Sequence, residues 1–284
     1  MSADPSSAAP GPAKPFAVAV SGVGLYLPGY LTAQSWASGE ALPADQPQKP
    51  TGLAFDRVNR RRASQMGRAI ADVVHEALAQ ASADPVTTPV IVGSSIGEAS
   101  AMIGLLDQMW REKEPMSPAV FTVSVHNAAS GLLSISAKNK GYTTSIAADY
   151  DTPAAVLLEA IGLIATGHER VAVVCADEAS PRSLLEHAPH WEMLAAALVL
   201  SRSDDPAALA QLAVASAPDD TRPDATTLPQ WPDGIEHNPQ VGLADLADAV
   251  LRRRFGALAL DRGKGRGFAV TLTPGATGSG EQGA

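Results

Sequence analysis

A serine in the turn Gly93-Ser94-Ser95-Ile96-Gly97 has the spacing of a reactive nucleophile. The turn has the pattern G-x-S-x-G, follows an apolar run and precedes an expected helix, and this setting exposes the oxygen of Ser95 for attack on an ester carbonyl. A carboxylate and a histidine would have to complete such a site. The available candidates are Asp177, His187, His190 and His237.

A phenol between two carboxylates, Asp149-Tyr150-Asp151, lies just before a helix expected from about residue 153 to 165. The buried start of a helix offers unpaired N–H groups and the positive end of its dipole, and both favour a nucleophilic anion. A phenol has a pKa of about 10, and flanking carboxylates oppose its ionisation further. We therefore expect Tyr150 to be a poor nucleophile, and we interpret Asp149 and Asp151 as residues that cap the helix and offset its dipole.

The single cysteine, Cys175, occurs inside an apolar strand expected from Val171 to Ala176. A cysteine in such a strand usually serves as a small core residue, so we do not expect a catalytic thiol. One cysteine also excludes an internal disulfide framework and a metal site built from several cysteines. Because no phosphate loop, dinucleotide fingerprint or metal-ligand spacing occurs, we expect neither a cofactor nor a metal.

The composition bounds the class of protein. Of 284 residues, 45% are apolar and 18% charged, which suffices for one sizeable core or two modest domains. The formal net charge of −9 argues against nucleic acid or an anionic membrane surface as the main partner. No apolar run reaches the roughly 18 residues that a membrane helix requires, and the N-terminus lacks the regions of a signal peptide. We expect a cytoplasmic protein.

Hydrophobic periodicity places these residues on alternating strands and helices. Apolar and β-branched runs predict strands near residues 16–27, 89–93, 144–148, 171–176, 194–200, 212–216 and 267–272. Helical spacing predicts helices near residues 62–81, 98–110, 127–131, 153–165 and 243–253. This order predicts an α/β fold with a largely parallel sheet.

The helix at residues 153–165 is apolar on nearly all sides, so we expect it to be buried between layers, with Thr152 as its cap.

The two ends of the chain differ from the rest. Residues 1–14 are rich in Pro, Ala and Ser and residues 274–284 in Gly, and such segments bury too little apolar surface to offset their ordering entropy. We predict one domain over residues 15–273 between two disordered tails.

Taken together, the chain resembles the N-terminal half of a β-ketoacyl synthase, a thiolase-like fold with a layered sheet and a buried central helix. The resemblance covers roughly residues 15–205 and is most specific over 124–178. The segments that carry it are the turn 93–97, the helix start Asn127-Ala128-Ala129-Ser130-Gly131, the turn Lys140-Gly141 and the strands 144–148 and 172–178.

The resemblance implies that the nucleophilic cysteine of an active synthase would stand at the position of Tyr150. It also implies two further polar groups, usually histidines, from a C-terminal half. Beyond Asp205 the chain has one histidine, His237, and too few residues for a second half-domain. These departures resemble the short chain length factors of type II polyketide and aryl-polyene synthesis, in which an active ketosynthase partner supplies the chemistry on an acyl carrier protein.

The same resemblance suggests where partners would bind. The strand near Thr144 and Ile146 would pair across the two-fold axis of a dimer, with His126 and Asn127 close to that interface. His126 would serve equally well as a hydrogen-bonded residue at the start of its helix. The clusters Arg60-Arg61-Arg62 and Arg252-Arg253-Arg254 are candidates for docking an acidic carrier protein, although such runs are often solvated helix ends.

Two other interpretations compete with a chain length factor. The first is an α/β-hydrolase-type esterase that uses Ser95, which a serine-reactive fluorophosphonate probe would reveal. The second is a scaffolding protein that keeps the fold only to associate and has no effect on product length.

Overall fold

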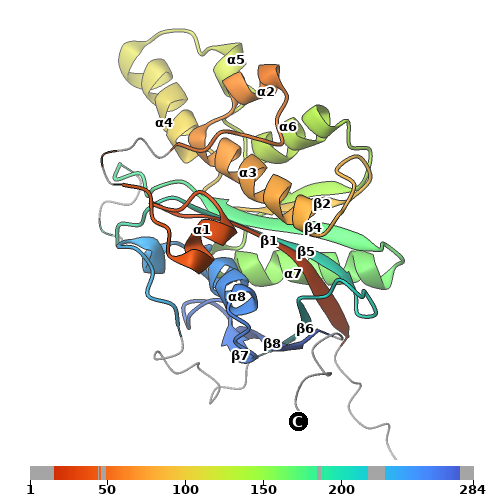
Figure 1. Cartoon of the computed structure of the whole chain (residues 1–284). Coiled ribbons are helices and arrows are strands. Elements are labelled where there is room, and N and C mark those ends of the chain that lie inside the picture. Colours follow the sequence, from red (N-terminus) through yellow and green to blue (C-terminus); the bar gives the residue numbers. More distant parts are fainter. Residues whose placement is uncertain are drawn as a thin grey trace, which may run out of the picture.

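A mixed sheet of eight strands forms the middle layer of the described structure (Figure 1). The computed structural model describes residues 16–43, 45, 49–183, 187, 189–216 and 228–275. Across the sheet the strand order is β3-β2-β4-β5-β1-β6-β8-β7. The strands are β1 (Ala17–Tyr26), β2 (Val90–Gly93), β3 (Thr143–Ile146), β4 (Arg170–Asp177), β5 (Leu194–Arg202), β6 (Ala210–Ser216), β7 (Gly256–Ala259) and β8 (Phe268–Pro274). The predicted tails lie outside the described residues, apart from Pro274, which ends β8, and Gly275.

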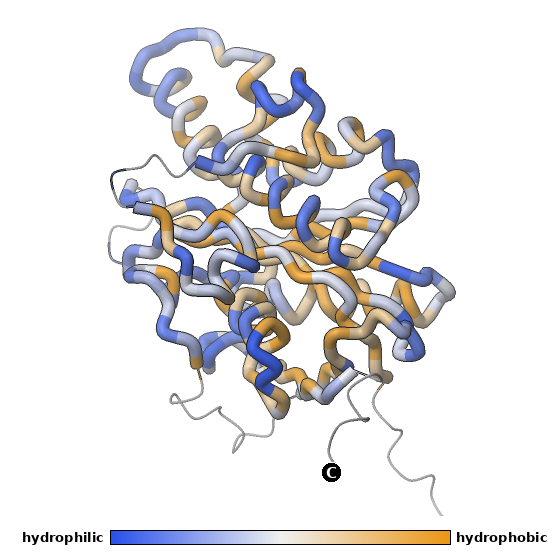
Figure 2. The backbone as a smooth tube through the Cα atoms, in the orientation of Figure 1, coloured by the Kyte–Doolittle hydropathy of each residue, from blue (hydrophilic) through white to orange (hydrophobic). Residues whose placement is uncertain are grey.

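Helices cover both faces of this sheet. They are α1 (Ala33–Ser38), α2 (Arg57–Arg62), α3 (Gln65–Gln80), α4 (Ala99–Asp107), the π-helix η1 (Gln108–Glu112), α5 (Pro118–Phe121), α6 (Ala128–Ala137), the 3₁₀ turn η2 (Asp149–Asp151), α7 (Thr152–Ala165), the 3₁₀ turn η4 (Ile235–His237) and α8 (Val241–Leu251). The helices α3 and α6 pack on one face, and α7 and α8 on the other, each with its own apolar cluster (Figures 1 and 2). None of the described helices has the length and apolar character needed to cross a bilayer.

The sheet is mixed, whereas the sequence predicted a largely parallel one. Only the pairs β2–β3 and β2–β4 are parallel. The pairs β4–β5, β1–β5, β1–β6, β6–β8 and β7–β8 are antiparallel. The reason is that β5 follows β4, and β8 follows β7, without a crossover helix, and strands joined directly pair antiparallel.

Helix α3 packs very closely on β1, and this fixes the register of the central strand. A Cβ atom on Gly22 or Gly24 would lie 2.1 Å from a carbonyl oxygen of α3, so only glycine fits there. Strand β6 pairs with β1 only as far as Val20. Beyond that point the side chains of Gln80 and Glu76 on α3 accept hydrogen bonds from the N–H groups of Val23 and Leu25, which leaves those buried donors satisfied.

Helix α7 is buried against the sheet but open on its other side, which corrects the expectation of burial on all sides. Val156, Leu157 and Ala160 are fully buried, whereas the side chain of Leu158 is 44% exposed. The described residues contain no second layer that would cover this side. Thr152 is the first residue of the helix and not its cap, because the helix begins after Asp151 without a side-chain cap.

The C-terminal segment is anchored by two buried carboxylates on α8. Asp245 accepts hydrogen bonds from the guanidinium of Arg262, at 2.6 and 2.7 Å, and from the indole of Trp231 at 2.8 Å. Asp248 accepts from the indole of Trp36 at 2.6 Å, and the two tryptophan rings stack with centroids 4.8 Å apart. The contact between Asp245 and Arg262 holds residues 261–267, the loop that reaches the corner at Tyr150.

Candidate functional site

Tyr150 lies in a sharp corner between β3 and α7. The backbone of Asp149 adopts a left-handed conformation, with φ of 51°. The hydroxyl of Thr152 accepts a hydrogen bond from Ala148 N at 2.9 Å and donates one to Asp149 O at 2.7 Å. The sequence predicted this corner, and these two bonds fix its shape.

The phenol of Tyr150 is half-buried and held by residues from the C-terminal segment. Its hydroxyl donates a hydrogen bond to the carbonyl oxygen of His237 at 3.2 Å and accepts one from Lys264 Nζ at 3.4 Å. Burial, and then the charge of Asp149, raise the pKa of Tyr150 above its usual value. Burial, and then the charge of Arg262, lower the pKa of Lys264. The phenol is therefore kept neutral and fixed in place, a state unsuited to nucleophilic attack.

The two carboxylates beside Tyr150 do not cap α7 with their side chains. Asp151 accepts a hydrogen bond from Arg266 N at 2.9 Å and lies 3.7 Å from the Arg266 guanidinium. The side chain of Asp149 is exposed. Asp151 therefore attaches the loop at residues 261–267 to the start of the helix.

A buried hydrogen-bond network lies directly beside this corner. Asp177, at the end of β4, is fully buried and accepts hydrogen bonds from Ser94 Oγ, Ser95 N and Ile96 N. Gln240, also fully buried, donates through Nε2 to Asp177 at 2.9 Å and to Ser95 Oγ at 2.7 Å. Burial raises the pKa of Asp177, and these hydrogen bonds oppose that shift. The network joins the turn after β2, the end of β4 and the start of α8.

Ser95 has no histidine partner in the described part of the chain, so the geometry does not support the esterase interpretation. Its hydroxyl donates to Asp149 O at 3.0 Å and accepts from Gln240. His126 Nε2 bonds the carbonyl oxygen of Ser94 at 2.8 Å and does not reach the Ser95 hydroxyl. His190 bonds another serine, Ser180.

His126 is fixed against the glycine-rich turn. A Cβ atom on Gly97, whose φ is 58°, would lie 3.0 Å from the His126 ring. This close contact, with the bond to Ser94 O, places His126 as a hydrogen-bonded residue at the entry to α6. Its neighbour Asn127 is exposed immediately before the helix.

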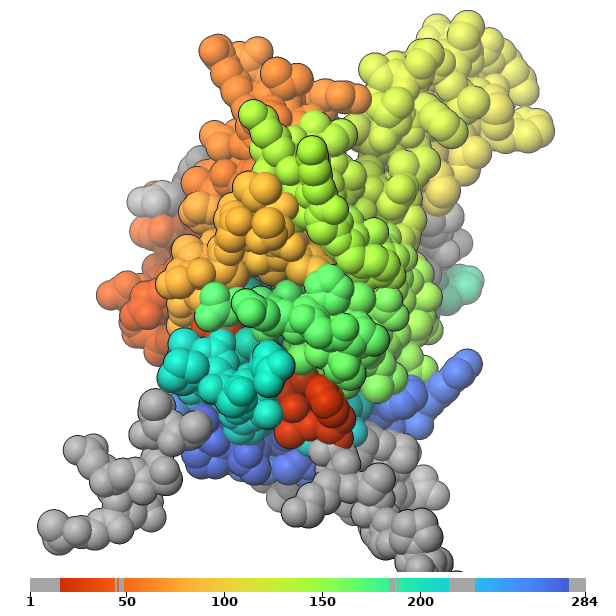
Figure 3. Space-filling view, turned by 90° about the vertical axis from the view of Figure 1, so that its right-hand side faces the viewer, coloured from red at the N-terminus to blue at the C-terminus, as the bar shows by residue number. Residues whose placement is uncertain are grey.

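Strand β3, which carries Thr144 and Ile146, is an edge strand of the sheet. It pairs with β2 alone among the described strands. The helices α6 and α7 contact it. Large exposed apolar side chains lie on these helices, on the segment before β3, and on α5 and the segment after it, and we call the set the β3-edge surface: Val120, Phe121, Val125, Ile135, Tyr142 and Leu158. In Figure 3 the yellow-green and green segments that carry these residues adjoin on one side of the molecule.

The two arginine clusters differ in their surroundings. Arg252 and Arg254 pair with the buried Asp248, so they belong to the anchoring of α8. In α2, Arg60 donates to Gly52 O and Phe55 O. Arg62 donates to Thr122 Oγ1, whereas Arg61 is exposed and its guanidinium has no hydrogen bond within the described residues.

Cys175 is fully buried in β4, and burial raises the pKa of its thiol well above the usual value. A buried thiol of raised pKa is unreactive. Its sulfur would lie 2.8 Å from a Cβ atom built on Gly93, so it packs directly beneath the turn that carries Ser94 and Ser95.

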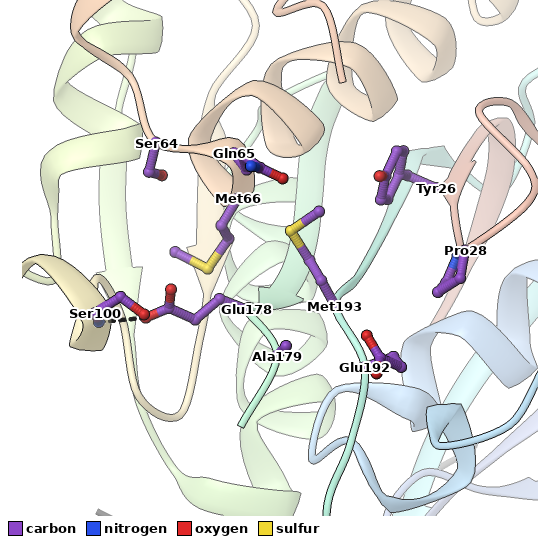
Figure 4. Close-up of a pocket in the computed structure, with 10 residues that line it drawn as sticks. All are labelled: Tyr26, Pro28, Ser64, Gln65, Met66, Ser100, Glu178, Ala179, Glu192 and Met193. Carbon is purple, nitrogen blue, oxygen red and sulfur yellow. Dashed lines mark hydrogen bonds between the residues drawn. The ribbon is translucent and has the colours of Figure 1, made fainter. Parts of the chain in front are cut away.

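A cavity near the sheet ends lies beside the start of α3. It has a volume of about 540 Å³ and is shown in Figure 4. A second cavity, of about 450 Å³, opens beside the corner itself between Ala155, Leu158, Arg266 and Phe268. This second cavity borders the β3-edge surface through Leu158.

Several solved structures that contain ketosynthases share this fold. A ketosynthase (ApeO) in complex with its chain length factor (ApeC) from Xenorhabdus doucetiae matches with a TM-score of 0.64 and 21% identity over 91% of this chain and 99% of the matched chain. The ishigamide ketosynthase/chain length factor matches with a TM-score of 0.59 and 17% identity over 74% and 70% of the two chains. A type II ketosynthase bound to its acyl carrier protein (AntDE:AntF) matches with a TM-score of 0.62 and 16% identity over 92% and 100%.

These identities establish a shared fold only. The comparison with curated proteins finds no match. The sequence model described as Beta-ketoacyl synthase, N-terminal domain matches residues 33–240, well over half of the chain. With this match and the thiolase-like architecture of the sheet, the chain belongs to the β-ketoacyl synthase N-terminal domain family.

Proposed function

We propose that the protein is a non-catalytic chain length factor. It pairs with an active β-ketoacyl synthase in the cytoplasm and helps set the length of a polyketide or aryl-polyene chain carried on an acyl carrier protein. The observation that carries this proposal is the neutral phenol of Tyr150, held by His237 and Lys264 where the family resemblance expects a cysteine. A fixed phenol with a raised pKa cannot take over thiol chemistry.

The β3 edge supports the pairing with a synthase subunit. An unpaired edge strand presents a row of free N–H and C=O groups that a second chain can extend. Exposed apolar side chains around such an edge mark a surface that a partner covers. We propose that Thr144 and Ile146 lie in the centre of this contact, with the β3-edge surface around them.

The cavity beside the corner supports a role in chain length. It opens between Ala155, Leu158 and Phe268, and Leu158 belongs to the β3-edge surface. When a partner covers this surface, the cavity would lie at the junction of the two subunits. A growing acyl chain directed there would meet apolar side chains that limit its extension.

The α2 arginines support contact with an acidic carrier protein. Arg57, Arg60, Arg61 and Arg62 give a six-residue helix four positive charges in a chain of net charge −9. A local basic patch on an acidic protein attracts an acidic partner to the patch, because the rest of the surface carries the same charge as the partner. Because Arg60 and Arg62 bond within the chain, the exposed Arg57 and Arg61 are the arginines available to pair with a carrier-protein carboxylate.

The experiment that tests the non-catalytic role uses a reconstituted system of this chain, its ketosynthase partner and a loaded carrier protein. Replacing the nucleophilic cysteine of the partner by alanine should abolish condensation completely. Tyr150→Phe in this chain should leave the condensation rate within about twofold, because the phenol takes no part in the chemistry. Condensation that survives the partner's loss of its cysteine and disappears with Tyr150→Phe would contradict the proposal.

A further inference from the structure

A serine, a histidine and a glutamate form a hydrogen-bonded chain that the proposed function does not use. Ser180 Oγ lies 2.8 Å from His190 Nδ1, and His190 Nε2 lies 3.0 Å from Glu192 Oε1. Ser180 follows β4, and the other two residues directly precede β5. The backbone N–H of Ser180 donates to Trp191 O at 3.0 Å, so the two segments are paired and the three side chains are held together.

The direction of these hydrogen bonds follows from their chemistry. An ionised carboxylate only accepts hydrogen bonds, so for a neutral imidazole Nε2 must carry the proton that Glu192 accepts. Nδ1 is then the acceptor, and the Ser180 hydroxyl donates to it. The N–H of Trp191 also donates to Ser180 Oγ, at 3.1 Å. The serine proton is therefore directed at a base, and its oxygen receives a donor that would stabilise negative charge.

One end of this hydrogen-bonded chain reaches the cavity of about 540 Å³ (Figure 4). Glu192 lines this cavity, as does Ala179, the residue before Ser180. Much of the wall is apolar and comes from Tyr26, Pro28, Met66 and Met193. Figure 4 shows Met66 and Met193 extending into the space between the strand ends and α3. Ser180 is 7% exposed and is not itself a lining residue. The cavity comes next to it at Ala179, and this is where a reacting carbonyl would have to lie.

We propose that Ser180, His190 and Glu192 form a second, hydrolytic site for short-chain acyl esters and thioesters, with the acyl group in the apolar part of the cavity. Ser180 is the nucleophile, His190 the base and Glu192 the residue that positions the imidazole. The site uses neither Tyr150 nor any residue of the β3-edge surface.

The reaction balances with water as the only co-reactant. Ser180 Oγ bonds to the acyl carbon while its proton passes to His190 Nδ1. This proton leaves with the alcohol or thiol as the ester C–O or thioester C–S bond breaks. His190 then takes a proton from water, the water oxygen bonds to the acyl carbon, and the proton returns to Ser180 as the acyl-serine bond breaks. The products are a carboxylic acid and an alcohol or thiol.

The test compares the purified chain with four variants. p-Nitrophenyl butyrate and butyryl-coenzyme A serve as ester and thioester substrates, and a fluorophosphonate reports a reactive serine. Ser180→Ala should reduce hydrolysis to the buffer rate and abolish labelling, and His190→Gln should do the same. Glu192→Gln should lower kcat about tenfold or more with little change in KM, as expected of a positioning residue.

Ser95→Ala is the matched control, because it removes a serine hydroxyl near the sheet ends that has no histidine partner. It should keep full hydrolysis and full labelling. Thermal unfolding of each variant confirms that its fold is intact. Hydrolysis by the wild-type chain at the same rate as Ser180→Ala, or labelling lost in Ser95→Ala and kept in Ser180→Ala, would overturn the proposal. Neither result would bear on the pairing with a ketosynthase.

Discussion

The ammonium group of Lys264 lies 4.8 Å from the centre of the Tyr150 ring and 3.4 Å from its hydroxyl. This contact joins two segments that are 114 residues apart in the sequence. It places a cation against the face and the oxygen of the phenol at once. The corner that would hold a nucleophile is thereby closed by residues of the C-terminal segment.

Loss of this cation should destabilise the corner. A cation over an aromatic ring contributes about 0.5–2 kcal/mol, depending on its burial. We expect Lys264→Met to lower the free energy of unfolding by that amount in urea titrations. Lys113→Met is the matched control, because it removes a contact of the same kind at the surface: Lys113 lies 5.5 Å from the ring of Trp110, which is 66% exposed. Equal losses of unfolding free energy in the two variants would show that the contact of Lys264 with Tyr150 does not stabilise the fold more than a surface contact does.

The network around Asp177 should be necessary for stability. Asp177→Asn places an amide N–H₂ among several hydrogen-bond donors, from Ser94, Ser95 and Gln240. A buried donor left without an acceptor costs about 1–3 kcal/mol, and we expect a loss of that size by chemical denaturation. The exposed Asp204, which pairs with Arg202 on the surface, provides the control substitution Asp204→Asn, with an expected change within about 0.5 kcal/mol. Similar effects at the two positions would contradict the role given to Asp177.

Glu98 should make the stability of the protein depend on pH near neutrality. Burial, together with the charge of Glu178, raises the pKa of Glu98 from 4.5 to about 7 in the folded chain, against a hydrogen bond from Ser64. The folded state therefore holds a proton that the unfolded state releases between these values. This contribution to stability is complete below pH 4.5 and is lost as the pH rises through about 7.

From pH 5 to pH 8 the loss should amount to roughly 2–3 kcal/mol. Glu98→Gln keeps an oxygen that can accept from Ser64 but cannot ionise. The difference in unfolding free energy between wild type and this variant, measured by urea titration at several pH values, should change by that amount over this interval. A difference independent of pH would show that Glu98 does not titrate there.

The β3-edge surface should be required for binding the ketosynthase partner. Ile135 on α6 is 66% exposed, so Ile135→Asp should leave the free chain folded and weaken the complex at least tenfold in size-exclusion or calorimetric titration. Leu53→Asp is the matched control, since Leu53 is 54% exposed and lies beside α2. Loss of the complex in the Leu53 variant, with binding retained in the Ile135 variant, would show that the interface lies outside the β3-edge surface.

Arg61 should contribute to binding of the carrier protein. Arg61→Glu reverses an exposed charge on α2, and we expect several-fold weaker binding of the acidic carrier protein at low salt and a smaller effect at high salt. Arg253→Glu is the matched control, because it makes the same change on an exposed arginine outside α2, beside Phe255. Binding unaffected by Arg61→Glu, measured by fluorescence anisotropy, would remove α2 from the docking surface.

The fold followed from local patterns to a large extent. The apolar run of β2, the helical spacing of α3 and the corner before α7 all depend on residues close in the sequence, and the structure confirms them. Strand β7 was missed, because four residues, Gly256–Ala259, carry little periodicity. The exposure of Leu158 also could not be foreseen, since it depends on which layers the rest of the chain provides.

The candidate site was foreseen in part. The sequence indicated Tyr150 and its carboxylates, because they stand together at a helix start. It did not indicate Gln240, which reaches Ser95 across 145 residues. It also did not show that His190 belongs to Ser180 and not to Ser95, because side-chain pairing between loops is set by the strand order. A lone glutamine after Pro239 gives no signal in the sequence.

The measurement that tests the central claim most directly is the mass of the product made by the ketosynthase partner with and without this chain. With the chain present, a stable one-to-one complex should release a polyketide or polyene of one defined length. Without it, the product should be missing or changed in length. A product of the same yield and length in both reactions would contradict the account and leave the protein without a role in chain length.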